Sequence, residues 1–293
     1  MSDFIYLHFW GKKIFISIDY KCYEIKKYLL QLRHISGIPV QVQISSNPNQ
    51  ELECPTLHIF ASDTPKLEFL EQNQTLNLYI NWQTIENRVS SLSNIIGQLI
   101  SLACVNSYEF PLHSAVVARD GKAYFILGAS GAGKTNLSLA LCKKNNFLWL
   151  ANDWSALRLD RNSVIVSQGY DLINFRTASI NQIADYLPVP VIEQIQDNHN
   201  DAMDFSRKSR FYHSDEVEIQ KADLPLLVSR MYFVQIAQNE EKKITQLAPN
   251  EIIEKLTYEF FWVLRGLGSF LISHSSEVIL PSVVMCPLRN ASR

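Results

Sequence analysis

Eight consecutive residues, Gly128-Ala129-Ser130-Gly131-Ala132-Gly133-Lys134-Thr135, constrain this chain more than any other feature of its sequence. They match the pattern GxxxxGK(S/T) at every specified position. The apolar run Ala123–Leu127 precedes them and predicts a strand, and the leucine spacing in Asn136–Lys144 predicts a helix after them. Glycine permits positive φ. In a loop between a strand and a helix, this freedom lets successive backbone N–H groups point at phosphate oxygens. We therefore predict a phosphate-binding loop at 128–135; the alternative is a glycine-rich turn with an exposed lysine.

The last two residues of this loop have expected roles of their own. Lys134 would bridge the β- and γ-phosphates of a nucleoside triphosphate, and the hydroxyl of Thr135 would ligate Mg²⁺. We therefore expect ATP and Mg²⁺ as cofactors. Because a loop of this kind contacts phosphates and not the base, ATP and GTP stay open, although no guanine-specificity motif of the NKxD type is present.

A candidate acid follows the helix. The apolar run Phe147–Ala151 predicts a strand that leads to Asp153, which lies 153 − 134 = 19 residues after Lys134. A carboxylate beside the γ-phosphate can hold the metal ion or accept the proton of an attacking hydroxyl, and the sequence does not separate these roles. The alternative is that Asp153 caps a turn.

The pattern along the chain predicts two domains of α/β class, with Pro111 as the boundary. Residues 1–110 form a smaller mixed α/β lobe, which we interpret as a region for acceptor or partner recognition, and residues 111–293 form the nucleotide domain. In the lobe we expect strands at Phe4–Phe9, Lys13–Ile18, Pro39–Ile44, Thr56–Phe60 and Leu76–Ile80, and helices at Tyr23–Leu32 and Ile85–Asn106. In the nucleotide domain we further expect strands at Ser114–Ala118, Ser155–Leu159, Ser163–Ser167, Leu226–Ile236, Ser269–Ile272 and Glu277–Leu280, helices at Thr177–Tyr186 and Asn250–Leu267, a turn at Leu187–Pro190 and a surface loop at Gln194–Asp215.

Composition and charge exclude several classes of protein. The chain is 47% hydrophobic and 19% charged, as globular proteins are, and its net charge of −2 gives no basic field for nucleic acid. Five widely spaced cysteines without a CxxC pair argue against a disulfide framework or a zinc site. The most apolar helical stretch, Leu92–Val105, is shorter than the roughly twenty residues that a bilayer requires, and Met1–Tyr6 lacks a basic export signal. We expect a cytoplasmic protein without a membrane or nucleic-acid partner.

Three segments together resemble the nucleotide domain of the HPr kinase/phosphorylase family, whose C-terminal catalytic domain is a P-loop serine kinase. They are Leu112-His113-Ser114, the loop at 128–135 and Ala151-Asn152-Asp153, and the likeness covers Leu112–Leu159. The resemblance implies that His113 neighbours the catalytic acid, that Lys134 and Thr135 bind phosphate and metal, and that Asp153 is the second of two paired acids. The first of the pair is Asn152 in this chain. Hexamers occur in that family, so a homo-oligomer is one implied assembly.

Two functions from different classes follow. The first is a Mg²⁺-dependent kinase that transfers the γ-phosphate of ATP to a hydroxyl of a protein, a peptide or a small molecule, with Asp153, His113 and Lys134 as catalytic residues. The second, favoured by Asn152, is a nucleotide-binding regulator or scaffold with little turnover. Further cationic candidates could bind phosphate or an acidic partner, or could be solvated surface charges: Arg176, Arg207, Lys208 and Arg210. The neighbouring Phe211 and Tyr212 could stack on a base or fill the core.

Overall fold

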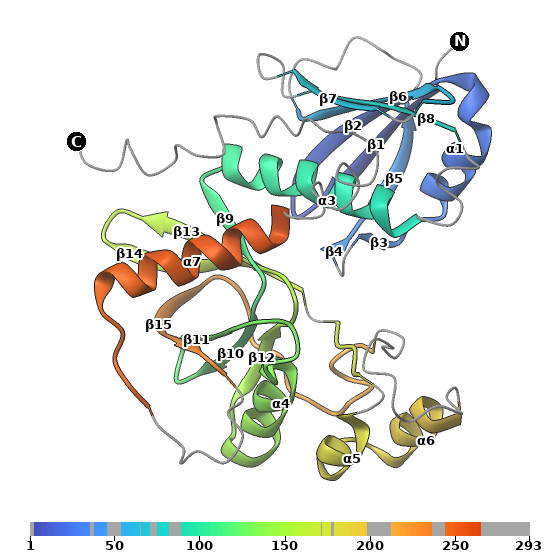
Figure 1. Cartoon of the computed structure of the whole chain (residues 1–293). Helices are drawn as coiled ribbons and strands as arrows, with labels where there is room; N and C mark the ends of the chain where they lie inside the picture. The colour runs from blue at the N-terminus through green and yellow to red at the C-terminus, as the bar shows by residue number, and fades with distance from the viewer. Residues whose placement is uncertain are drawn as a thin grey trace. The chain divides into compact units, whose positions relative to one another are not determined.

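The computed structural model describes residues 3–35, 38–45, 54–64, 66–70, 75–81, 89–170, 172–176, 179–197, 212–235 and 244–264 (Figure 1). The chain forms two compact units, of which the first contains the residues up to Ser107 together with those from Phe261 onward, and the second spans Tyr108–Phe260. Pro111, the expected boundary, lies inside the first strand of the second unit, at the edge of its sheet. An edge position suits proline because it has no N–H to donate to a neighbouring strand.

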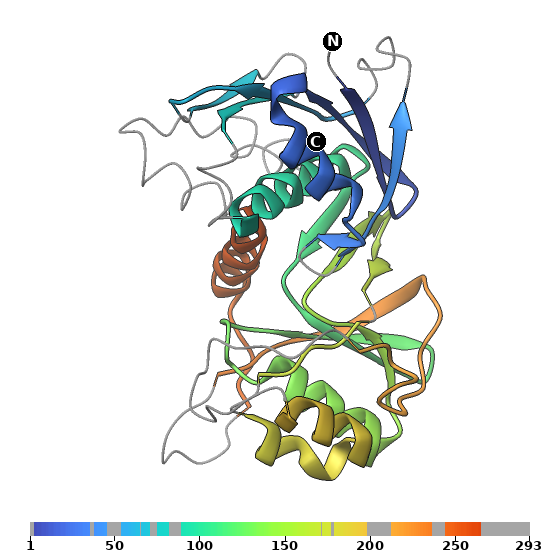
Figure 2. The ribbon, with the colours of Figure 1, turned by 90° about the vertical axis from the view of Figure 1, so that its right-hand side faces the viewer.

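The first unit is built on a six-stranded mixed sheet with the order β5-β1-β2-β6-β8-β7. Helix α3 packs along this sheet against β2 and β6 (Figure 2). The strands are β1 (Asp3–Phe9), β2 (Lys12–Ile18), β5 (Gln41–Ser45), β6 (Thr56–Ala61), β7 (Lys66–Leu70) and β8 (Thr75–Ile80), beside a small pair β3 (His34–Ile35) and β4 (Ile38–Pro39); the helices are η1 (Tyr20–Cys22), α1 (Tyr23–Leu30) and α3 (Val89–Asn106).

Most of the expected elements of this unit are confirmed. Strand β7 was not expected, because its alternating Lys66 and Glu68 have low strand propensity and only pairing with β8 organises them. The expected start of the second helix, Ile85, lies outside the described residues, and α3 is described from Val89.

The second unit is built on a seven-stranded mixed sheet with the order β12-β10-β11-β15-β14-β13-β9. Its β11–β15 pair is parallel and its other pairs are antiparallel. The strands are β9 (Glu109–Leu112), β10 (Ala115–Arg119), β11 (Lys122–Leu127), β12 (Leu148–Ala151), β13 (Ser155–Asp160), β14 (Ser163–Gly169) and β15 (Leu226–Phe233); the helices are α4 (Lys134–Asn145), α5 (Ile180–Ile183), η5 (Ala184–Tyr186), α6 (Val189–Asp197) and α7 (Pro249–Leu264).

Helices cover both faces of this second sheet. Alternate residues of β10 point to opposite faces, as strand geometry requires. Val117 packs with Leu141 of α4, and Val116 belongs to the cluster that contacts Leu256 of α7. The sheet is therefore the middle layer, with α4 on one face and α7 on the other.

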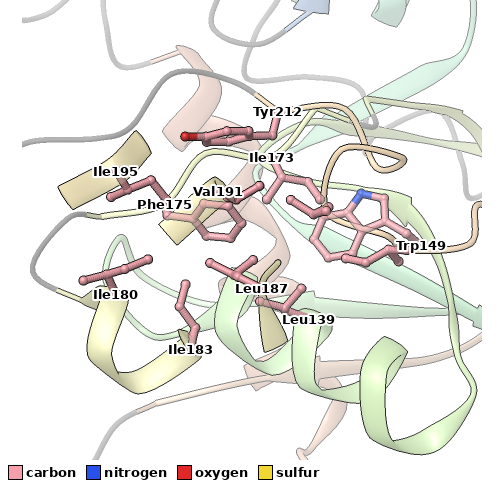
Figure 3. Packing of buried hydrophobic residues seen from close by; sticks show 12 residues of the cluster. Leu139, Trp149, Ile173, Phe175, Ile180, Ile183, Leu187, Val191, Ile195 and Tyr212 are labelled. Carbon is pink, nitrogen blue, oxygen red and sulfur yellow. The ribbon is translucent and has the colours of Figure 1, made fainter. Parts of the chain in front are cut away.

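A further apolar cluster joins α4 to the short helices α5 and α6 (Figure 3). Leu139 of α4 and Trp149 of β12 are fully buried in it. Tyr212 is 1% exposed and its ring lies 5.9 Å from that of Phe175, so this tyrosine fills the core and does not offer a face to a base. Phe211 lies outside the described residues.

Several expected boundaries in this unit need correction. The segment Leu187–Pro190 is not only a turn: it leads into α6, whose first turn accommodates Pro190 because the first-turn N–H groups have no intrahelical acceptor. Helix α6 also replaces the start of the expected loop Gln194–Asp215, of which 198–211 lie outside the described residues. The helix expected at Thr177–Tyr186 is the shorter pair α5 and η5, and β15 ends at Phe233. The strands expected beyond residue 264 lie outside the described chain. None of the described helices has the length and hydropathy of a membrane span.

Candidate functional site

The loop between β11 and α4 depends on three glycines with positive φ. Gly128, Gly131 and Gly133 have φ values of 144°, 86° and 84°. Gly133 is the N-cap residue of α4 and has no side chain with which to cap the helix. The first-turn N–H groups of α4 therefore lack both intrahelical acceptors and a capping side chain, at the positive end of the helix dipole. This arrangement can receive an anion.

Gly128 is required for a second reason. A Cβ atom built on it would lie 2.4 Å from the backbone oxygen of Val234, and the N–H of Val234 donates to the carbonyl of Leu127 at 2.8 Å. The segment after β15 therefore holds the start of the loop in place.

Lys134 folds back into the loop. Its Nζ donates to the carbonyl oxygens of Gly128, at 2.7 Å, and Ala129, at 3.2 Å, and the residue is 6% exposed. Charge-assisted hydrogen bonds hold the ammonium group among the backbone groups of the loop. From this position the ammonium group can form an ion pair with an anion bound in the loop.

The segment Asn152-Asp153 lies at the same edge of the sheet as this loop. Strands β11 and β12 are both antiparallel to β10, so they run in the same direction, and their carboxyl ends meet at one edge. Thr135 Oγ1 donates to Asn152 Oδ1 at 2.8 Å, and Asn152 is 1% exposed. The Nδ2 atom of Asn152 is buried without a hydrogen-bond partner in the described chain.

Asp153 has a strained backbone. Its φ of 61° is in the left-handed region, which aspartate tolerates better than most residues. The N–H of Trp154 donates to the carbonyl oxygen of Asn152 at 2.7 Å and closes a tight turn around it. Such strain is typical of functional sites, where the surrounding structure maintains it.

His113 reaches Asp153 because of the pairing of β9 with β13. Leu112 is opposite Ser155 in this ladder, so the next residue, His113, lies near the turn that precedes Ser155. His113 Nε2 is 3.9 Å from Asp153 Oδ1, and His113 Nδ1 is 3.7 Å from Glu259 Oε2. Of the predicted catalytic residues, Asp153 and His113 are thus neighbours.

The electrostatic environment of His113 disfavours its charged form. Burial lowers the pKa of His113, and the positive charge of Lys134 adds to this effect. The negative charges of Glu259 and Asp153 act in the opposite direction but do not cancel the shift.

Sequence reasoning missed Glu259 and left the role of Arg176 open. Glu259 comes from α7 and is 3% exposed; the available signal was an acid inside a largely apolar helical segment. Arg176 was considered as a clamp or as a surface charge, and its Nη2 donates to Ser130 Oγ at 2.9 Å, so it reaches the loop. The other cationic candidates, Arg207, Lys208 and Arg210, lie outside the described residues.

Thr135, its hydrogen-bond partner Asn152 and the adjacent Asp153 could hold a magnesium ion. Their side chains offer a hydroxyl, an amide oxygen and a carboxylate, and Mg²⁺ prefers oxygen ligands. The Thr135 hydroxyl donates its proton to Asn152 Oδ1. The lone pairs of the hydroxyl oxygen can therefore bind a cation. In the described chain no group of three His, Cys, Asp or Glu side chains could hold a metal alone, so phosphate and water oxygens would complete the coordination, as is usual for Mg²⁺.

Comparisons with known proteins add little to this geometry. Neither the family models nor the curated proteins compared with the chain match it. Solved structures do match, and among them is the Hpr(Ser) kinase/phosphatase from Coxiella burnetii, with 14% sequence identity, coverage of 56% of this chain and 98% of that chain, and a TM-score of 0.22. The chain is a mixed α/β protein with two mixed sheets.

Proposed function

We propose that this protein is an ATP- and Mg²⁺-dependent phosphotransferase that moves the γ-phosphate to a hydroxyl group. The supporting observation is the loop at 128–135, where three positive-φ glycines lead into a helix N-terminus and Lys134 lies inside the loop. The resemblance of its sequence segments to the HPr kinase family agrees with this proposal.

Each residue of the site then has a task. The loop N–H groups bind the phosphates, and Lys134 exchanges the carbonyls of Gly128 and Ala129 for the β- and γ-phosphate oxygens. Thr135 and Asp153 would hold the metal ion, which would offset the charge of the transferring group. Asp153 accepts the proton of the attacking hydroxyl as the acceptor oxygen bonds to phosphorus and the bond to ADP breaks.

A second candidate function is a nucleotide-binding regulator with little turnover. The observation that favours it is the neutral Asn152 at the position where Thr135 finds its hydrogen-bond acceptor. A carboxylate there would bind a cation more strongly than an amide does. Both candidates require nucleotide binding, and only the first requires phosphoryl transfer.

The test is transfer of label from γ-labelled ATP. Purified protein is incubated with labelled ATP and Mg²⁺, with and without lysate from its own source, and label is sought on a discrete protein, peptide or small molecule. The Asp153→Asn variant should still bind nucleotide through the loop at 128–135 and lose roughly 10²- to 10⁴-fold in transfer rate, the contribution of a general base. Transfer at the wild-type rate by Asp153→Asn would refute the base assignment. Tight binding with no transfer to any acceptor would favour the regulator.

A further inference from the structure

Glu259 is a buried acid to which the proposed chemistry assigns no task. It lies on α7, where Glu251, Glu254 and Lys255 are exposed, whereas Glu259 is 3% exposed. A carboxylate removed from water is costly unless hydrogen-bond donors satisfy it. A partner is therefore needed to explain its burial.

In the described chain the ion-pair contact of Glu259 is with His113. The distance from Glu259 Oε2 to His113 Nδ1 is 3.7 Å, and on the other side of the ring His113 Nε2 is 3.9 Å from Asp153 Oδ1. The imidazole thus lies between two carboxylates, with one ring nitrogen facing each. The charged groups that act on it are Glu259, Asp153 and Lys134.

A neutral imidazole has a single N–H, so the two carboxylates compete for it. The side chain of Glu259 is 4% exposed and that of Asp153 is 19% exposed. Water can solvate the Asp153 carboxylate more readily. A hydrogen bond from the ring N–H therefore stabilises the carboxylate of Glu259 more than that of Asp153.

We infer that Glu259 is a positioning residue for the site: it accepts the Nδ1–H of His113 and thereby holds the ring in place beside Asp153. The present separation is longer than a hydrogen bond, and contacts of this kind often tighten only when ligands bind. The arrangement matches a general pattern in which a carboxylate orients a functional histidine through its second nitrogen. The predicted effect on rate rests on the proposed function, but the position of the proton does not.

The first test needs no variant of Glu259. Long-range ¹H–¹⁵N spectra of ¹⁵N-histidine-labelled full-length protein report which ring nitrogen is protonated, and the His113→Gln variant assigns the signal. We expect a proton on Nδ1 of His113. A bare Nδ1, with the proton on Nε2 alone, would overturn the proposal even if the protein had no kinase activity.

The second test separates an acceptor role from a purely structural one. The Glu259→Leu variant removes the acceptor, Glu259→Gln keeps an oxygen that can accept, and Glu254→Leu is the control on the exposed face of α7. Release of inorganic phosphate from MgATP should fall about 10- to 100-fold in Glu259→Leu, the usual cost of losing the partner of a functional histidine. We expect partial recovery in Glu259→Gln, and a Kd for MgATP equal to that of the wild type.

The outcomes are distinguishable. A wild-type rate in Glu259→Leu, or no recovery in Glu259→Gln, would contradict the positioning role. If Glu259→Leu does not fold, the Glu259→Gln rate and the Nδ1 proton decide. If no activity is found in the wild type, the proposed function fails while the spectra still test the contact.

Discussion

The glycines of the loop differ in their surroundings although all three have positive φ. Gly128 combines a φ of 144° with a backbone oxygen 2.4 Å from any added Cβ, whereas an added Cβ at Gly131 meets no atom within 4 Å. Gly128→Ala should therefore lower the free energy of unfolding by roughly 2–5 kcal/mol, from strain and overlap together. Gly131→Ala should cost about 1–2 kcal/mol from the left-handed backbone alone. Urea denaturation of both variants checks this order, and equal losses would refute the role of Val234.

Individual residues also show how far sequence reasoning reaches. The motif at 128–135 predicted the loop, and the apolar run before Asp153 placed an acid at the end of β12, because both patterns are local in the chain. Asn152, Arg176 and Glu259 make contacts that depend on pairing between distant segments. Ser130 and Arg176 are 46 positions apart, and periodicity holds no information about such a contact.

Among the elements, α4 connects the loop to the core of the second unit. Leu139 of α4 is fully buried with α5 and α6, whereas Leu137 on the same helix is 40% exposed. Leu139→Ala should lower the free energy of unfolding by about 2–5 kcal/mol through lost burial and a cavity. Leu137→Ala is the matched control and should change little. Similar urea midpoints for the two variants would contradict the packing of α4 described above.

Two helices contain thiols that burial keeps protonated. Burial raises the pKa of Cys142 in α4 to about 12 and that of Cys22 in η1 to about 11, with the carboxylate of Asp19 adding to the shift at Cys22. Because the folded protein favours the neutral thiol, this contribution to stability is complete below the unfolded pKa of about 8.5 and is lost as pH rises through the folded pKa values. At pH 8, iodoacetamide should modify both thiols slowly in the folded protein and rapidly in urea. Equal rates would show that they are not buried.

Helices and strands were predicted correctly where the residue pattern along the chain was strong. They were missed where tertiary contacts determine the secondary structure. The strands β1, β2, β6 and β8 follow β-branched and aromatic runs. Pro188 and Pro190 predicted a turn where α6 begins, and polar residues predicted a loop from Gln194, where α6 ends. Proline is nevertheless compatible with a first helical turn. Charged β7 is a strand because β8 pairs with it.

For the whole molecule, the near-balanced charge means that affinity for a nucleotide must come from the local geometry of the loop. The net charge is −2, so no overall positive field attracts phosphate. Lys134, the first-turn N–H groups of α4 and Arg176, whose guanidinium reaches Ser130, are local sources of positive potential. A single substitution in the loop should therefore abolish binding without altering the rest of the surface.

The most direct test is the thermal stability of the protein with MgATP. At about 100 times Kd, binding to the folded state should add about 2.7 kcal/mol to the free energy of unfolding and raise Tm. The wild type and Lys122→Ala, which removes a charge from the opposite end of β11, should show this rise, and Lys134→Ala should show none. No rise in the wild type, or an equal rise in Lys134→Ala, would contradict a nucleotide site at residues 128–135.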